Sequence, residues 1–128
     1  MRDDVALILG ISGQDGGYLA DLLLAKGYRV HGTSRDAEVG SFSNLRKLDI
    51  RDKVAVHSLT PHDFRSVLDL LSAVRPTEVY NLTGQSSVAL SFQQPVETFE
   101  SITVATINIL ECIRFSGLPM RFFNSCKC

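Results

Sequence analysis

Apolar residues along the chain fall into short runs that alternate with stretches of helical spacing. The runs with the length and apolar content of buried strands are Val5–Leu9, Arg29–Thr33, Lys53–Ser58, Glu78–Leu82 and Met120–Asn124. Strands that alternate with helices favour a parallel sheet joined by right-handed crossovers. We therefore expect an α/β fold, a Rossmann-like doubly wound parallel sheet of about five strands, in a single domain over residues 1–128.

The segments between these strands have helical patterns. We expect the first helix to begin near Gly17 and to end at Gly27, with an apolar face made of Leu19, Leu22 and Leu23. A long helix is predicted over Pro95–Ser116, with a face made of Ile102, Thr106, Ile109, Leu110 and Ile113. A short helix is expected at Asn44–Leu48.

A further helix is predicted after the third strand. Thr60 is expected to cap it, with Pro61 at the first helical position and Asp63 as the acidic partner of the cap. The apolar stripe that follows has the spacing of a helix packed on a sheet and consists of Phe64, Val67, Leu68 and Leu71. Arg75-Pro76 is expected to end this helix.

Composition and charge exclude several classes of protein. The chain has 128 residues, 45% hydrophobic and 21% charged, with a formal net charge of -1, which disfavours nucleic-acid binding. It has no apolar run long enough for a membrane span and no signal peptide, so we expect no membrane partner and a cytoplasmic location.

The glycine-rich turn after Val5–Leu9 is the first candidate site. Gly10 would permit a tight turn, Gly13 would let phosphates approach the backbone, and Gly16 would let the helix pack closely. Such a turn predicts a dinucleotide pyrophosphate bound at a helix N-terminus. The alternative is a strand-to-helix turn without a ligand.

The end of the second strand bears on which dinucleotide binds. Arg35, with the hydroxyls of Thr33 and Ser34, favours the 2′-phosphate of NADP, because a guanidinium holds phosphate through paired hydrogen bonds. Asp36 is an acid that would instead suit the 2′-hydroxyl of NAD. We expect NADP, with NAD as the alternative.

Four segments carry a resemblance to a known family. They are Gly10-Ile-Ser-Gly-Gln-Asp-Gly-Gly-Tyr-Leu-Ala, Lys26-Gly-Tyr-Arg-Val-His-Gly, Arg75-Pro-Thr-Glu-Val-Tyr-Asn-Leu-Thr-Gly-Gln-Ser and Val88-Ala-Leu-Ser-Phe-Gln-Gln-Pro. The chain, up to about Phe123, resembles the amino-terminal part of GDP-mannose 4,6-dehydratases, which are extended short-chain dehydrogenase/reductases. The resemblance implies an NADP-dependent lyase acting on a GDP-sugar: it oxidises C4, eliminates water across C5 and C6, and returns the hydride at C6.

The resemblance also implies roles for individual residues. Those expected at the pyrophosphate and ribose are Gly10, Ser12, Gly13, Gln14, Asp15 and Gly16, with Arg35 at the 2′-phosphate. Those expected beside the nicotinamide are Leu82, Thr83, Gly84 and Gln85, with Ser86 facing the sugar substrate.

Some positions depart from the family pattern. Ser58 and Leu59 stand where the family has Asp-Leu at the adenine. Ser58 and Asp36, which stands where many members have a second Arg, are expected to weaken cofactor binding. Ser87 replaces a common His at the substrate edge.

The catalytic residues implied by the resemblance are missing. The family uses a Ser or Thr after the fifth strand, a nearby Glu, and Tyr-x-x-x-Lys, yet none of Tyr18, Tyr28 and Tyr80 is followed by Lys at that spacing. Ser125-Cys126-Lys127-Cys128 departs abruptly from the pattern, which leads us to expect a shifted reading frame or a premature stop. We assign no catalytic residue to this chain.

Neither cysteines nor histidines predict a metal site. Cys126 and Cys128 have no accompanying ligand cluster. We expect His31, His57 and His62 to share no face of the fold. No metal is therefore expected.

Three functional hypotheses remain. The chain is an NADP-binding module without activity alone, a component of an active dehydratase completed by further sequence or a partner chain, or a structural domain that no longer binds cofactor. In the family fold, later strands and helices cover the apolar surface of the long helix. A chain without those elements leaves this surface uncovered, so we also expect a homodimer or higher homo-oligomer.

Overall fold

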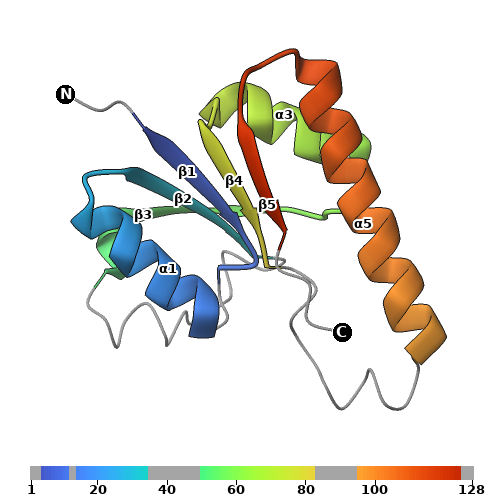
Figure 1. Cartoon of the computed structure of the whole chain (residues 1–128), viewed down its shortest axis with the longest axis horizontal. Coiled ribbons are helices and arrows are strands. Elements are labelled where there is room, and N and C mark those ends of the chain that lie inside the picture. The colour runs from blue at the N-terminus through green and yellow to red at the C-terminus, as the bar shows by residue number, and fades with distance from the viewer. Residues whose placement is uncertain (1–3, 12–13, 35–49, 83–94, 125–128) are drawn as a thin grey trace.

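The computed structural model describes residues 4–11, 14–34, 50–82 and 95–124, and statements about structure concern these residues. Its elements are β1 (Val5–Leu9), α1 (Gln14–Ala25), β2 (Arg29–Ser34), the 3-10 turn η1 (Arg51–Lys53), β3 (Val54–Ser58), α3 (Phe64–Val74), β4 (Glu78–Asn81), α5 (Pro95–Ser116) and β5 (Arg121–Asn124) (Figure 1). Every predicted strand is present within one residue at each end, and the expected helix at Asn44–Leu48 lies outside the described residues.

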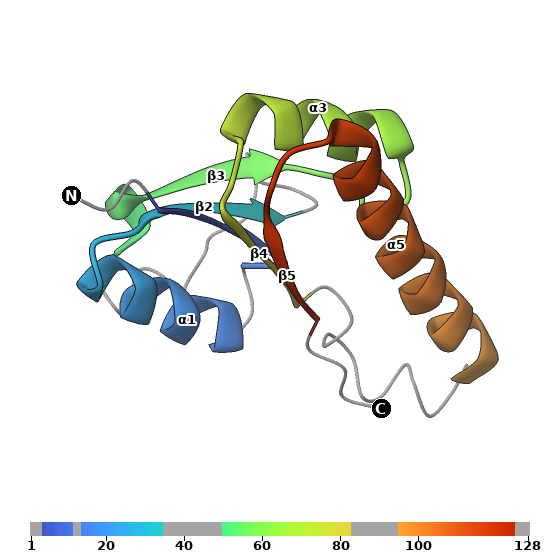
Figure 2. The same ribbon diagram turned by 45° about the horizontal axis from the view of Figure 1, so that its top comes forward.

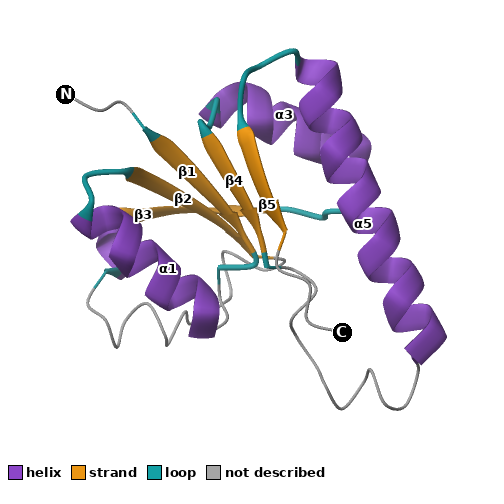
Figure 3. Cartoon of the chain, viewed as in Figure 1, coloured by secondary structure: helices purple, strands orange, loops and turns teal. Residues whose placement is uncertain are grey.

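The strands form one parallel sheet in the order β3-β2-β1-β4-β5. The order reverses between β1 and β4, which confirms the doubly wound topology. Helix α1 covers one face of the sheet, and α3 and α5 cover the opposite face (Figures 2 and 3). This arrangement places the central strand β1 between two layers of helix.

A separate hydrophobic core lies on each face. The core beneath α1 consists of Ala6, Ile8, Ile11, Ala20, Leu23, Val30, Ile50 and Val54. The core beneath α3 and α5 consists of Leu7, Leu9, Leu59, Val67, Leu71, Val79, Ile109 and Cys112. Because successive residues of a strand point to opposite faces, β1 supplies both cores, which explains its uninterrupted apolar sequence.

Helix α1 differs from the prediction in its start and its buried face. It begins at Gln14 rather than Gly17. Ala20 and Leu23 are buried, while Leu22 is 53% exposed. The buried stripe is therefore centred on Ala20, a small residue that lets the helix lie close to the sheet. Gly27, with φ of 87°, follows the helix and supports the expected glycine stop.

Helix α3 begins later than predicted. Asp63 is its N-cap residue in extended backbone, and its N–H donates to the Thr60 carbonyl at 3.1 Å, so Thr60–Asp63 form a separate turn before the helix. The Asp63 carboxylate accepts a hydrogen bond from Ser66 Oγ at 2.6 Å. Val67 and Leu71 are buried as expected. Arg75, at φ of 51°, ends the helix as its sequence indicates.

The long helix α5 has the predicted bounds but a slightly different buried face. Ala105, Ile109 and Cys112 are buried at positions spaced by four and three residues, whereas Leu110 is 44% exposed. Gly117, at φ of 69°, follows its last residue. In the part of the chain that the structure describes, no helix is long and apolar enough to cross a membrane.

Candidate functional site

The carboxyl ends of the strands meet at one edge of the sheet. Leu9 of β1 is the register partner of Thr33 on one side and of Asn81 on the other. Ser34 pairs with Ser58 at the end of β3. In doubly wound sheets the ligand crevice lies at this edge, where the strand order reverses, here between β1 and β4.

The turn after β1 is held by the end of β2. Gly10 has φ of 84°, a conformation that favours glycine and turns the chain out of the strand. The Thr33 carbonyl accepts the N–H groups of Gly10 at 3.1 Å and Ile11 at 2.9 Å. The Thr33 hydroxyl also accepts the Gly10 N–H, at 3.3 Å. The turn is therefore fixed by a strand distant in sequence.

These hydrogen bonds correct one sequence expectation. Thr33 was expected to help bind a 2′-phosphate, but it is only 2% exposed and its hydroxyl faces Gly10. The N–H groups of Gly10 and Ile11 are also engaged. Any main-chain contacts to phosphate from this turn must therefore come from amides after Ile11, and the contribution of Gly10 is to the shape of the turn.

Ile11 fits between two glycines. A Cβ at Gly16 would lie 2.7 Å from the Ile11 carbonyl oxygen, so this glycine allows the first turn of α1 to approach the backbone of the β1 turn. A Cβ at Gly32 of β2 would lie 2.4 Å from Ile11 Cδ1. The close packing expected of Gly16 is thus made against the turn rather than against a strand.

The ends of β3 and β4 lie beside this turn. Ser58 is exposed, whereas the Leu59 side chain is buried in the core beneath α3 and α5. The Leu59 N–H donates to the Ser34 carbonyl at 3.0 Å, and the Leu82 N–H donates to the Leu9 carbonyl at 2.9 Å. Leu82 is half-buried against the core beneath α1. Ser58, rather than Leu59, therefore has an exposed side chain at this edge of the sheet.

The other predicted site residues lie outside the described residues. These are Ser12, Gly13, Arg35, Thr83, Gly84, Gln85 and Ser86, together with Asp36, Ser87, Cys126 and Cys128. Gln14 and Asp15 belong to the first turn of α1, and only their main chain is described. Contacts of these residues with a cofactor or substrate stay predictions.

An amide network that sequence reasoning missed joins the buried Asn81 of β4 to the exposed Asn124 of β5 and to α5. Asn81 is 3% exposed, and its Nδ2 donates to Asn124 Oδ1 at 3.0 Å and to Thr106 Oγ1 at 3.4 Å. Asn81 and Asn124 are register partners at the carboxyl ends of their strands. The available signal was a polar residue at the end of each strand. The network fixes the far side of the crevice edge.

The histidines correct a second expectation. His31 and His57 share a face of the sheet, and His31 Nδ1 lies 3.0 Å from His57 Nε2. The ring centroids are 5.3 Å apart, close to the N–N distance plus the two ring radii, so the rings meet edge to edge through a hydrogen bond. Burial, followed by the charges of His57 and Arg29, lowers the pKa of His31. Among the described residues, no group of three or more candidate ligands could hold a metal ion.

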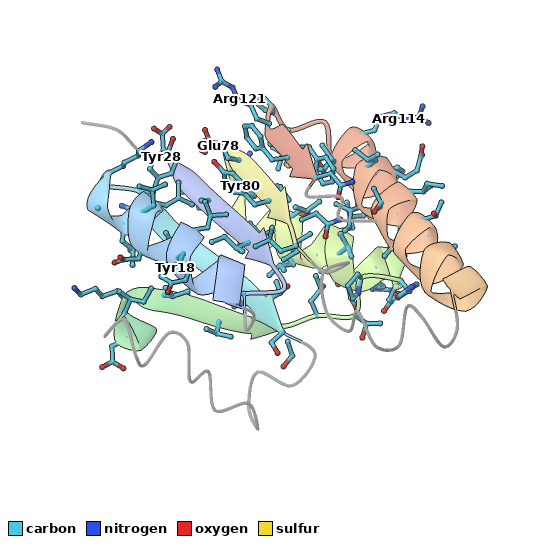
Figure 4. All side chains as sticks on the ribbon, turned by 60° about the horizontal axis from the view of Figure 1, so that its bottom comes forward. Tyr18, Tyr28, Glu78, Tyr80, Arg114 and Arg121 are labelled. Carbon is cyan, nitrogen blue, oxygen red and sulfur yellow. The ribbon has the colours of Figure 1, made fainter. Side chains whose placement is uncertain are left out.

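A second polar cluster lies at the opposite end of the sheet. Glu78, at the start of β4, accepts hydrogen bonds from Tyr80 at 2.8 Å and Tyr28 at 3.2 Å (Figure 4). Burial, reinforced by the Glu78 hydrogen bond, raises the pKa of Tyr80. Tyr80 also stacks on Phe123, with centroids 4.8 Å apart. Glu78 lies at the amino end of β4, whereas Asn81 lies at its carboxyl end, toward the crevice edge.

Comparisons with known proteins identify relatives of this sequence. The sequence profile of the family described as GDP-mannose 4,6 dehydratase matches residues 7–127 and so extends past Phe123, where we expected the resemblance to stop. The GDP-mannose 4,6-dehydratase of Vibrio cholerae serotype O1 is 43% identical over 128 residues, covering 94% of this chain and 34% of that protein. The GDP-mannose 4,6 dehydratase of Homo sapiens is 38% identical, covering 90% of this chain and 32% of that protein. The chain spans about a third of the length of these relatives.

Two solved structures with the same fold are UDP-glucose 4-epimerases. UDP-glucose 4-epimerase from Thermotoga maritima, solved with UDP-glucose, has a TM-score of 0.78 at 24% identity and covers 96% of this chain and 38% of the epimerase. UDP-glucose 4-epimerase from Thermus thermophilus, solved with NAD, has a TM-score of 0.72 at 27% identity and covers 89% of this chain and 35% of the epimerase. The matched part of this chain thus corresponds to 38% and 35% of the two epimerase chains.

Proposed function

Because this chain belongs to the GDP-mannose 4,6-dehydratase family, we propose that it is a dinucleotide-binding module whose ligand is NADP. The observation that carries the proposal is the turn from β1 into α1, in which Gly10 adopts positive φ and Gly16 admits the Ile11 backbone. This shape brings the N-terminus of α1 to the crevice edge, where helix N–H groups favour anions. The NAD held by the Thermus relative supports a nicotinamide dinucleotide here.

The residues of this chain would divide the dinucleotide among them. Main-chain N–H groups at Ser12, Gly13 and Gln14 would bind the pyrophosphate, and Asp15 and Gly16 would border the ribose. Arg35 would hold the 2′-phosphate, and Ser58 would lie at the adenine. Leu82 through Gln85 would line the nicotinamide, with Ser86 toward a GDP-sugar. When bound, the nicotinamide supplies hydride transfer.

The proposed module has no dehydratase activity by itself. Acid-base chemistry at the sugar requires positioned proton donors and acceptors, and the chain contains no Tyr-x-x-x-Lys. Incubation with GDP-mannose and NADP should therefore yield no 4-keto product. Formation of that product would show instead that the chain is an active dehydratase, and product that appears only with a second chain would show that it is a component of one.

Calorimetric titration with NADP and NAD tests the binding proposal. We expect both to bind, NADP more tightly, and Arg35→Gln to weaken NADP while leaving NAD unchanged, because only NADP has the 2′-phosphate. Arg29→Gln is the matched control, since Arg29 is an exposed arginine at the other end of β2. If neither NADP nor NAD binds, the chain is instead a structural domain without a cofactor.

Self-association is the second part of the proposal. The outer surface of α5 exposes Val104, Ile107, Leu110 and Phe115, and Phe64 of α3 contacts Phe115 edge to face at 5.7 Å. A shallow groove beside them is lined by His62, Phe64, Val104, Ile107, Asn108 and Glu111. Burying such an apolar surface favours a homodimer or higher homo-oligomer. Sedimentation velocity should show a homo-oligomer that Ile107→Glu dissociates into monomers. A monomeric parent protein would contradict this part of the proposal.

The cytoplasmic location stays a prediction.

A further inference from the structure

Thr33 of β2 reaches the glycine turn through two different acceptors. Its carbonyl accepts the N–H groups of Gly10 and Ile11, and its side-chain hydroxyl accepts the Gly10 N–H a second time. Thr33 is the register partner of Leu9, the residue immediately before Gly10. It is also almost fully buried. The hydroxyl is therefore directed at the first peptide of the turn, from a position where the sheet fixes its own backbone.

The second acceptor matters because Gly10 is a glycine. A glycine at positive φ has more alternative conformations than other residues, so fixing one of them costs more conformational entropy. A single carbonyl acceptor tolerates rotation of the Leu9–Gly10 peptide, whereas carbonyl and hydroxyl together restrict the direction of the N–H. A turn ordered in advance binds its ligand more tightly, because the ordering cost is not incurred on binding.

We propose that Thr33 is a positioning residue for the dinucleotide: its hydroxyl presets the Gly10 turn and thereby raises affinity without touching the ligand. This inference rests on the proposed function. The hydroxyl faces the turn rather than the end of β2, so it acts on the part of the crevice where NAD and NADP are alike. Loss of the hydroxyl should weaken both dinucleotides equally and leave the preference between them unchanged.

Thr33→Val and Thr33→Ser form a matched pair for the test. Valine has the shape of threonine without the hydroxyl, and serine keeps the hydroxyl without the methyl group. Neither removes the main-chain acceptor, so Gly10 and Ile11 keep their carbonyl hydrogen bonds and both variants are expected to fold. Calorimetric Kd values for NADP and NAD are measured for each variant, together with amide hydrogen exchange at Gly10 and Ile11 by NMR.

We expect Thr33→Val to raise both Kd values by roughly three- to tenfold, the range for one lost hydrogen bond, and Thr33→Ser to stay within about twofold of the parent. The Gly10 amide should exchange faster in Thr33→Val alone. A Thr33→Val protein that binds both dinucleotides as the parent does would overturn the proposal. So would weakening confined to NADP, which would mean that the hydroxyl contacts the 2′-phosphate, or a Thr33→Ser protein as weak as Thr33→Val.

The two proposals fail separately. If the parent chain binds neither dinucleotide, the proposed function is wrong, and the exchange experiment alone decides whether Thr33 orders the turn. Unchanged exchange at Gly10 in Thr33→Val would then reject the ordering as well. If the parent binds and the two variants do not differ, only the role of Thr33 is rejected.

Discussion

The side chain of Ile11 occupies the space that a side chain at Gly32 would need, with Ile11 Cδ1 only 2.4 Å from where a Cβ at Gly32 would lie. Ile11 is fully buried and follows the turn glycine Gly10, while Gly32 lies in the middle of β2. The glycine in the strand therefore accommodates the residue that anchors the turn to the sheet. The contact joins the candidate site to the core beneath α1.

Gly32→Ala should destabilise the fold by about 1–3 kcal/mol, the usual cost of overpacking a core. The cost should be smaller in an Ile11→Ala background, because the alanine removes two of the three atoms that crowd the added Cβ. Urea unfolding of the two single variants and the double variant measures this coupling. Equal costs of Gly32→Ala in both backgrounds would show that Ile11 is not the obstacle.

Gly16→Ala should behave differently from Gly32→Ala. The added Cβ would meet the Ile11 carbonyl oxygen and backbone carbons, the nearest at 2.7 Å, and these atoms cannot be removed by changing the Ile11 side chain. We expect a similar destabilisation of about 1–3 kcal/mol that Ile11→Ala does not relieve. Denaturant unfolding of Gly16→Ala with and without Ile11→Ala tests this, and relief by Ile11→Ala would contradict the backbone contact.

Removing one partner of the Asn81–Asn124 pair should cost stability. Asn124→Ala takes away the oxygen that accepts the Asn81 Nδ2–H at 3.0 Å, and Asn81 is almost fully buried. The expected loss is about 0.5–1.5 kcal/mol, the net contribution of one hydrogen bond, because Asn124 is exposed and Asn81 keeps its hydrogen bond to Thr106. Thermal unfolding measures it, with Arg121→Ala as a control at an exposed position of the same strand. Equal losses in both variants would mean that the amide pair contributes nothing specific.

Stability should fall as the pH is lowered toward about 5. Folding lowers the pKa of His31 through burial, then through His57 and Arg29, so the unfolded chain binds more protons than the folded chain below the ordinary histidine pKa of about 6.5. The contribution of the neutral His31 to the free energy of unfolding is complete above that pH, and it is lost as the pH falls through the pKa of His31 in the folded chain.

Urea unfolding between about pH 5 and 8 tests this dependence, since histidines titrate in that range. His31→Gln should flatten the fall in the free energy of unfolding. His62→Gln, a histidine in the turn before α3, should keep it. A slope that is unchanged in His31→Gln would assign the dependence to other groups.

The sequence predicted the strands better than the contacts between them. Val5–Leu9 was predicted with its exact bounds because it is buried on both faces and needs an apolar residue at every position. Leu22 and Phe64 were misplaced, because helical spacing defines a stripe without deciding which flanking residue faces the core. His31 pairs with His57, and Gly10 with Thr33, across 26 and 23 positions of sequence. Those pairs follow from strand register, which local patterns do not contain.

The location of the ligand is the central claim, and an NMR titration of the isotope-labelled chain with NADP tests it most directly. The account predicts amide shifts concentrated at the carboxyl edge, at Gly10, Gly16 and Leu82, with little change at Tyr28 and Glu78 at the opposite end of the sheet. Shifts confined to the Tyr28 and Glu78 end or to the groove beside α5, or no shift at saturating NADP, would contradict it.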